Sequence, residues 1–129
     1  TNKGENQMDK QEAYSLKREL QQFTGSETFY RNPLFSKFIY TEGVKFLAEK
    51  AGVYWLLDHI FIHHTLPALK GQHFQTWKIK VAENETALIT VEDGNHNKLA
   101  SFPLAYIDFP LEEFTLWLVD NTLMLPSEY

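Results

Sequence analysis

The sequence predicts an α+β fold, with about three N-terminal helices packed on one face of a C-terminal antiparallel sheet of about five strands. Up to about residue 65, apolar side chains recur every three to four positions, as on one side of a helix. After Gly71 they recur at every second position, as on one face of a strand. Short turns separate these later runs, and short turns join antiparallel neighbours. Because the helices precede the strands, we expect them to form one layer on the sheet.

Length and composition favour one globular domain. The chain has 129 residues, of which 43% are hydrophobic, enough to build a core of its own. We expect residues 9–129 to form this domain and residues 1–8 to be a disordered or tag-derived lead-in. The sequence has no cysteine, which excludes disulfide-stapled domains and thiolate zinc sites. It shows neither a signal peptide nor a long apolar run, so we expect a cytoplasmic protein without a membrane partner.

The first helix is expected to begin at Asp9, because Glu12 follows three residues later as in a capping box. Gly25 is its expected stop. Four apolar residues between them have helical spacing: Ala13, Leu16, Leu20 and Phe23. Residues 24–33 are then expected to form a loop, and the apolar residues 34–40 fit either a helical turn or a strand.

Two further helices are expected before the sheet. Thr41 is the expected N-cap of a helix over about residues 42–51, and Gly52 should end or bend that helix. A third helix is expected over about residues 53–65. It should end before Pro67, because the proline ring cannot continue a helix.

The remaining runs alternate as strands do. They cover residues 77–81, 87–91, 98–107, 114–119 and 122–125. Asp93-Gly94-Asn95 is an expected turn between two of them. Pro103 cannot donate to a strand ladder, so its run should lie at an edge or a bulge of the sheet. Residues 111–119 also fit a helix that starts after Pro110, but their alternation favours a strand.

Three stretches of the chain carry a family resemblance: YTEGVKFLAEKAGVYWLLD (40–58), WKIKV (77–81) and DFPLEEFTLWLVDNTLMLPSEY (108–129). Together they resemble a family of small bacterial proteins that has only a domain-of-unknown-function label. The resemblance implies a compact bacterial domain and supplies no activity, substrate or catalytic residue. The positions of Asp58 and His63 match the family pattern, whereas those of His59 and His64 commonly hold other residues. This difference argues against a metal site built on two histidines.

Most candidate site residues lie in YWLLDHIFIHH, residues 54–64. With about 100° between successive helical residues, four side chains share one side of the expected helix. These four, which we call the polar stripe, are Trp55, Asp58, His59 and His63. His64 lies among the apolar residues of the other side, so we expect it to be structural.

The polar stripe allows more than one interpretation. His59 and His63 have the spacing that lets two imidazoles reach one metal ion. However, Ile60 stands where the zinc-protease motif has its glutamate, and two ligands do not complete a site, so we expect no metal and no cofactor. Asp58 beside a histidine could transfer protons, which makes an enzyme with catalytic Asp58, His59 and His63 the alternative function. We favour a structural role for these four residues, as the polar edge of a helix that packs on the sheet.

Trp117 predicts a binding surface on the sheet. Strand alternation directs Trp117 away from Leu116 and Leu118, toward a second covered face or a partner. Beside the C-terminal hairpin, it would form an apolar interface patch. We therefore predict a non-enzymatic binding domain that engages a protein partner or a second copy of itself. The candidate binding residues are Trp55, Asp58, His63 and Trp117.

The distribution of charge argues against one class of partner. Residues 1–50 hold 8 basic and 7 acidic side chains, whereas residues 51–129 hold 4 basic and 10 acidic ones. An acidic C-terminal half repels a phosphate backbone, so we expect no nucleic-acid partner.

Overall fold

The computed structural model describes residues 10–25, 27–105 and 111–129. Within these residues the α-helices are α1 (Lys10–Leu20), α2 (Glu42–Ala51) and α3 (Tyr54–His63). The strands are β1 (Phe29–Arg31), β2 (Ile39–Thr41), β3 (Phe74–Val81), β4 (Ala87–Glu92), β5 (Lys98–Leu104), β6 (Glu113–Val119) and β7 (Thr122–Met124), and the 3₁₀ helix η1 (Pro126–Glu128) follows them. All described strands form one sheet in the order β1-β2-β7-β6-β3-β4-β5.

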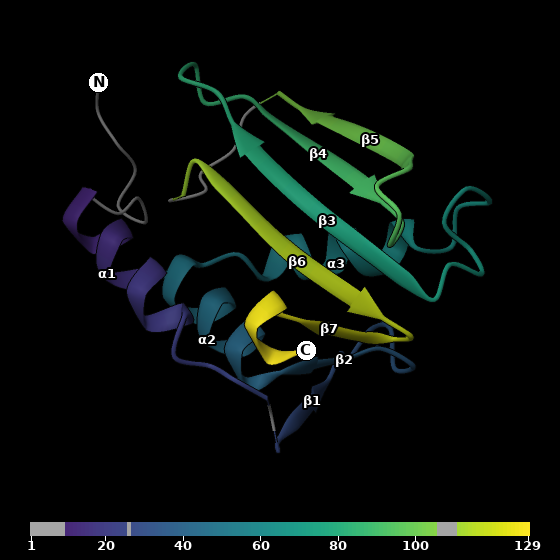
Figure 1. Ribbon diagram of the computed structural model, residues 1–129, viewed down its shortest axis with the longest axis horizontal. Coiled ribbons are helices and arrows are strands. Elements are labelled where there is room, and N and C mark those ends of the chain that lie inside the picture. The colour runs from purple at the N-terminus through teal and green to yellow at the C-terminus, as the bar shows by residue number, and fades with distance from the viewer. Residues whose placement is uncertain (1–9, 26, 106–110) are drawn as a thin grey trace.

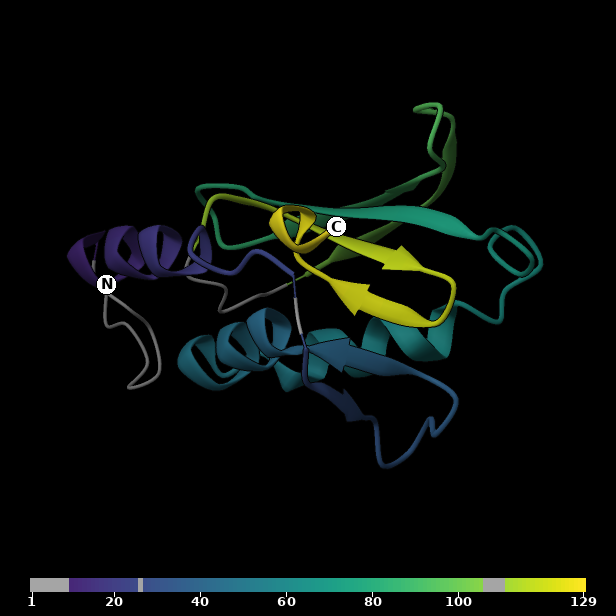
Figure 2. The same cartoon turned by 60° about the horizontal axis from the view of Figure 1, so that its bottom comes forward.

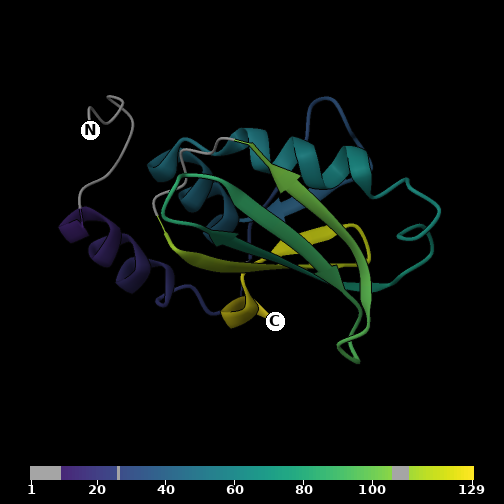
Figure 3. The same ribbon diagram turned by 90° about the horizontal axis from the view of Figure 1, so that it is seen from above.

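Helices α2 and α3 cover one face of this sheet, and α1 lies beside one end of the strands (Figures 1 and 3). Figure 2 shows η1 on the opposite side of the strands from α2 and α3. We call the side of the sheet that carries η1 the open face. The predicted α+β class, with the helices preceding most of the strands, is confirmed.

Local signals explain where the helices end. Thr41 caps α2 as predicted, because its Oγ1 accepts the Val44 amide at 3.3 Å. Gly52 ends α2 in the left-handed conformation, with φ of 67°. Helix α1 ends at Leu20, earlier than the predicted stop, and α3 ends at His63. The predicted cap at Asp9 and the predicted lead-in lie outside the described residues.

Strand β3 lies inside the sheet and pairs antiparallel with β4 and β6. Trp77 lies opposite Val91 on one side and Leu116 on the other, and all three side chains are fully buried beneath the helices. Residues 113–119 form strand β6, so the strand was the correct choice over a helix. Strand β5 forms an edge and contains Pro103, as predicted, while residues 106 and 107 of the predicted run lie outside the described residues.

The sheet differs from the prediction in two respects. The described strands number seven rather than about five, because the expected loop contains β1 and residues 39–41 form β2. The sheet is also not wholly antiparallel, since β2 pairs in parallel with β7 and places Tyr40 opposite Leu123. Strand β1 lies in the expected loop, and β2 overlaps the run 34–40, which fitted either a helical turn or a strand. An alternation over three residues is too short to decide between these alternatives.

A buried glutamine joins the end of α3 to the sheet. The side chain of Gln75 is fully buried, and its Oε1 accepts a hydrogen bond from Trp77 Nε1 at 2.9 Å. Its Nε2 donates to His64 Nδ1 at 2.8 Å and to the Leu69 carbonyl at 3.1 Å. Because His64 Nδ1 accepts here, the ring is neutral with its proton on Nε2. Burial also lowers the pKa of His64, which favours this neutral form.

A second buried polar group joins η1 to the N-terminus of α2. Glu128 accepts hydrogen bonds from Thr41 Oγ1 at 2.6 Å, the Gly43 amide at 3.2 Å and the Leu125 amide at 3.0 Å. Gly43 permits this approach, because a Cβ atom there would lie 2.7 Å from Glu128 Oε1. We call this arrangement the Glu128 cap; it satisfies amides that a helix leaves unpaired at its start.

Candidate functional site

The residues of the polar stripe lie in three different surroundings. Trp55 lies in the first turn of α3 and is 38% exposed. Asp58 faces the segment between β1 and β2, where Asn32 Nδ2 donates to Asp58 Oδ1 at 3.1 Å. His59 and His63 instead face β5, and their ring centroids lie 5.2 and 4.7 Å from that of Phe102. The polar stripe therefore consists of one exposed ring, one carboxylate that is hydrogen-bonded to a loop, and two rings packed on the sheet.

His59 has a buried nitrogen without a hydrogen bond. Within the described residues its Nε2 has no partner. The ring lies 4.1 Å from that of His63 and stands edge-on to Trp77 at 6.3 Å. Burial and the adjacent His63 lower the pKa of His59 from 6.5 to about 4, so its ring is neutral at pH 7.

We expect His59 to make the protein less stable at acidic pH. An unfolded histidine takes up a proton near pH 6.5, whereas the folded protein resists protonation of His59 down to about pH 4. Between these values the unfolded state binds more protons, so the free energy of unfolding decreases as the pH falls. Above pH 6.5 the histidine is neutral in both states, and this loss of stability is absent. Because this ring is partly exposed and solvent screens it, we expect the free energy of unfolding to fall by only about 1–2 kcal/mol across this pH range.

Urea unfolding of the wild type and His59→Phe across this pH range measures the effect. The variant should lose about 1–2 kcal/mol less than the wild type. His73→Phe is the matched control, because the side chain of His73 is 88% exposed. A His59 imidazole that titrates near pH 6.5 by NMR would contradict the expectation.

The contacts of the polar stripe do not place Asp58 against a histidine. The Asp58 carboxylate accepts a hydrogen bond from Asn32, and His63 Nδ1 donates a hydrogen bond to the His59 carbonyl at 2.7 Å. In the part of the chain that the structure describes, no three His, Asp or Glu side chains are grouped closely enough to hold a metal ion. The catalytic roles of Asp58, His59 and His63 therefore stay a prediction.

Three aromatic rings meet on the open face of the sheet. Phe74 of β3 and Trp117 of β6 have ring centroids 5.1 Å apart. Tyr129, which follows η1, lies 5.3 Å from Trp117 and 6.0 Å from Phe74. We call these three rings the aromatic cluster. The three rings contact one another and together form one apolar surface.

The surroundings of the aromatic cluster are apolar on one side and charged on the other. Met124 lies opposite Trp117 in the β6–β7 register. Toward the far end of β3, Lys78 Nζ lies 3.0 Å from Glu92 Oε1, and Lys80 Nζ lies 3.8 Å from Glu113 Oε1. The open face thus combines an apolar surface with lysines that are already paired.

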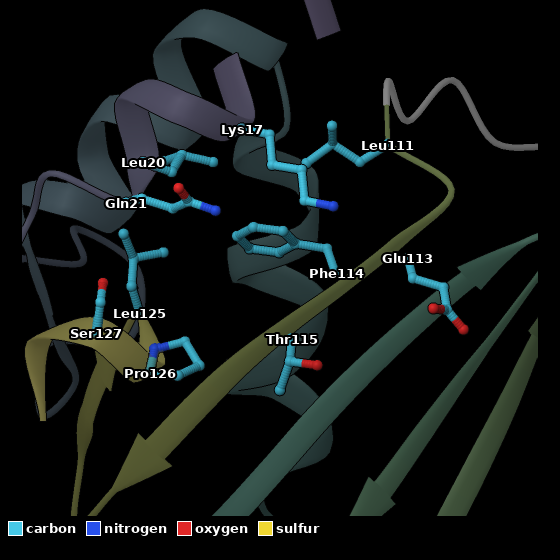
Figure 4. Close-up of a pocket in the computed structure, with 10 residues that line it drawn as sticks. All are labelled: Lys17, Leu20, Gln21, Leu111, Glu113, Phe114, Thr115, Leu125, Pro126 and Ser127. Atoms are coloured by element: carbon cyan, nitrogen blue, oxygen red, sulfur yellow. The ribbon is translucent and has the colours of Figure 1, made fainter. Parts of the chain in front are cut away.

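A groove opens between α1, β6 and η1 (Figure 4). It has a volume of about 370 Å³, and its floor contains Leu20, Leu111 and Leu125 from the hydrophobic core. Lys17 and Gln21 extend over the groove toward the ring of Phe114 (Figure 4). We call this cavity the α1 groove.

Comparison with known proteins identifies the family. A model of a family of unknown function, DUF6876, matches residues 14–129. The chain belongs to this family. DUF6876 agrees with the resemblance to a domain of unknown function, and its description assigns no activity. No curated protein and no solved structure matches the chain.

The membership in DUF6876 leaves function to be inferred from the surfaces of the fold. Among the described helices, none is long and apolar enough to cross a membrane. Trp117 was identified from the sequence, whereas Phe74 and Tyr129 were not. Extending the alternation of β3 back from Thr76 would have placed Phe74 on the same face. The residues of the α1 groove come from three distant segments, so no local motif indicates them.

Proposed function

We propose that this protein is a non-enzymatic binding domain that self-associates through the open face of its sheet. The observation that supports this function best is the aromatic cluster, in which the residue Tyr129 is 75% exposed. Aromatic rings are enriched at the centres of protein interfaces, because they bury a large area with few rotatable bonds. Sheet faces of this kind commonly pack against a second layer.

The distribution of charge favours a second copy as the occupant. The chain carries a net charge of −5, so two copies repel each other over most orientations. On the open face, however, Lys78 and Lys80 are paired with glutamates, and the aromatic cluster is uncharged. Two copies can therefore meet there with little repulsion. A two-fold pair is the commonest arrangement, and it places each aromatic cluster against the other copy.

We expect Trp117→Ser to weaken self-association. The substitution removes the central ring of the aromatic cluster while leaving the helix-covered face unchanged. The dissociation constant of the dimer should rise by about tenfold or more, as for the loss of an interface anchor. Light scattering after size-exclusion chromatography, over a series of protein concentrations, measures this change.

Trp55→Ser is the matched control, because it removes the same side chain from α3 on the other side of the sheet. Its dissociation constant should stay within about twofold of the wild type. Thermal unfolding of both variants verifies that they fold. A wild type that is monomeric at the highest concentrations would overturn the proposal, as would a dimer that Trp55→Ser disrupts and Trp117→Ser does not.

A further inference from the structure

The α1 groove combines an apolar floor with polar groups along one side. Leu20 and Leu125 belong to the buried core, so the floor is continuous with the interior of the protein. Its volume of about 370 Å³ lies within the range of small-molecule sites. An apolar ligand portion would thus exchange water for contacts with core side chains.

Two side chains above this floor, Lys17 and Gln21, present hydrogen-bond donors. Lys17 and Gln21 are four positions apart, on α1 and the turn after it, and therefore lie one helical turn apart. Figure 4 shows the Lys17 ammonium and the Gln21 side-chain nitrogen both directed toward the Phe114 ring. No acidic side chain of the described residues forms an ion pair with Lys17.

The acidic residue of the groove does not neutralise this end. The Glu113 carboxylate points away from Lys17 and Gln21 (Figure 4). It lies 3.8 Å from Lys80 Nζ on the open face of the sheet. Among the described residues, the Lys17 end of the groove thus has a positive charge with no carboxylate paired to it, although the chain as a whole is acidic.

We propose that the α1 groove binds a small monocarboxylate with an apolar body. The carboxylate is held by the Lys17 ammonium and the Gln21 amide, and the apolar body lies on Leu20, Leu111, Phe114 and Leu125. A carboxylate has two acceptor oxygens, one for each donor, and a single charge that matches a single ammonium. This site is separate from the aromatic cluster and does not depend on self-association.

The test is an NMR titration of the full ¹⁵N-labelled chain with octanoate, octan-1-ol and octylamine. These probes share an apolar chain and differ in the charge of the head group. Octanoate should cause saturable shifts of the backbone amides that line the groove, and bind about tenfold more tightly than octan-1-ol. Octylamine should bind more weakly than either, because its ammonium meets that of Lys17.

Two variants separate the groove from the general charge of α1. Lys17→Met should weaken octanoate binding about tenfold, to the level of octan-1-ol. Arg18→Met removes the same charge from a neighbouring exposed position outside the groove, and should leave octanoate binding within about twofold. The proposal is overturned if octanoate causes no saturable shifts at the groove, if octan-1-ol binds equally well, or if both variants weaken binding equally.

Discussion

Glu128→Ala is expected to lower the free energy of unfolding by about 3 kcal/mol, because it leaves several buried donors without an acceptor. Glu128 is 8% exposed and accepts from Thr41 Oγ1 and from the amides of Gly43 and Leu125. Its carboxylate also lies at the N-terminus of α2, where the helix dipole favours a negative charge. The loss of these hydrogen bonds should release η1 from the N-terminus of α2.

Urea unfolding monitored by circular dichroism measures this effect. Glu83→Ala is the matched control, because Glu83 is exposed in the turn between β3 and β4; its effect should lie within about 0.5 kcal/mol of zero. Glu128→Gln keeps one acceptor oxygen and should cost less than Glu128→Ala. Equal unfolding midpoints for the two alanine variants would show that the Glu128 cap contributes no stability.

Gln75→Leu is expected to destabilise the protein by about 3 kcal/mol, although leucine is apolar and the site is in the core. The substitution leaves Trp77 Nε1, His64 Nδ1 and the Leu69 carbonyl without the partners that Gln75 provides. A buried polar atom that loses its partner costs more than a hydrogen bond contributes, because it is also removed from water.

A double-mutant cycle with Trp77→Phe tests this explanation. Phenylalanine removes the indole N–H, so Gln75→Leu should cost about 1 kcal/mol less in the Trp77→Phe background than in the wild type. Gln11→Leu on the exposed side of α1 is the control for the change of residue type. Additive effects of the two substitutions would mean that the hydrogen bond between Gln75 and Trp77 does not stabilise the fold.

Much of the fold was predictable because it depends on local patterns. The alternation in residues 77–81, 87–91 and 114–119 corresponds to β3, β4 and β6. Thr41 and Gly52 act at the ends of α2 as their chemistry predicts. By contrast, β1 and β2 are too short to show a period. The parallel pairing of β2 with β7 joins distant segments, so no turn signals it.

The candidate site was less predictable than the fold. Helical spacing predicted that Trp55, Asp58, His59 and His63 share one side of α3, but in the structure only the rings of His59 and His63 contact each other. Spacing does not say what each side chain meets across the helix surface. Asp58 bonds to Asn32, and the two histidines pack on Phe102. Those partners belong to other elements, and their positions depend on how the layers dock.

Sequence periodicity was thus sufficient for the α+β class, the helix-to-strand order and the outward face of Trp117, because each depends on residues a few positions apart. The folded structure alone brings Thr41 to Glu128, 87 positions away, and closes α1, β6 and η1 around one groove. These contacts depend on sheet order and layer packing. Sequences with the same local periods are also compatible with other strand orders in the sheet. The surfaces available for binding are therefore properties of the folded chain.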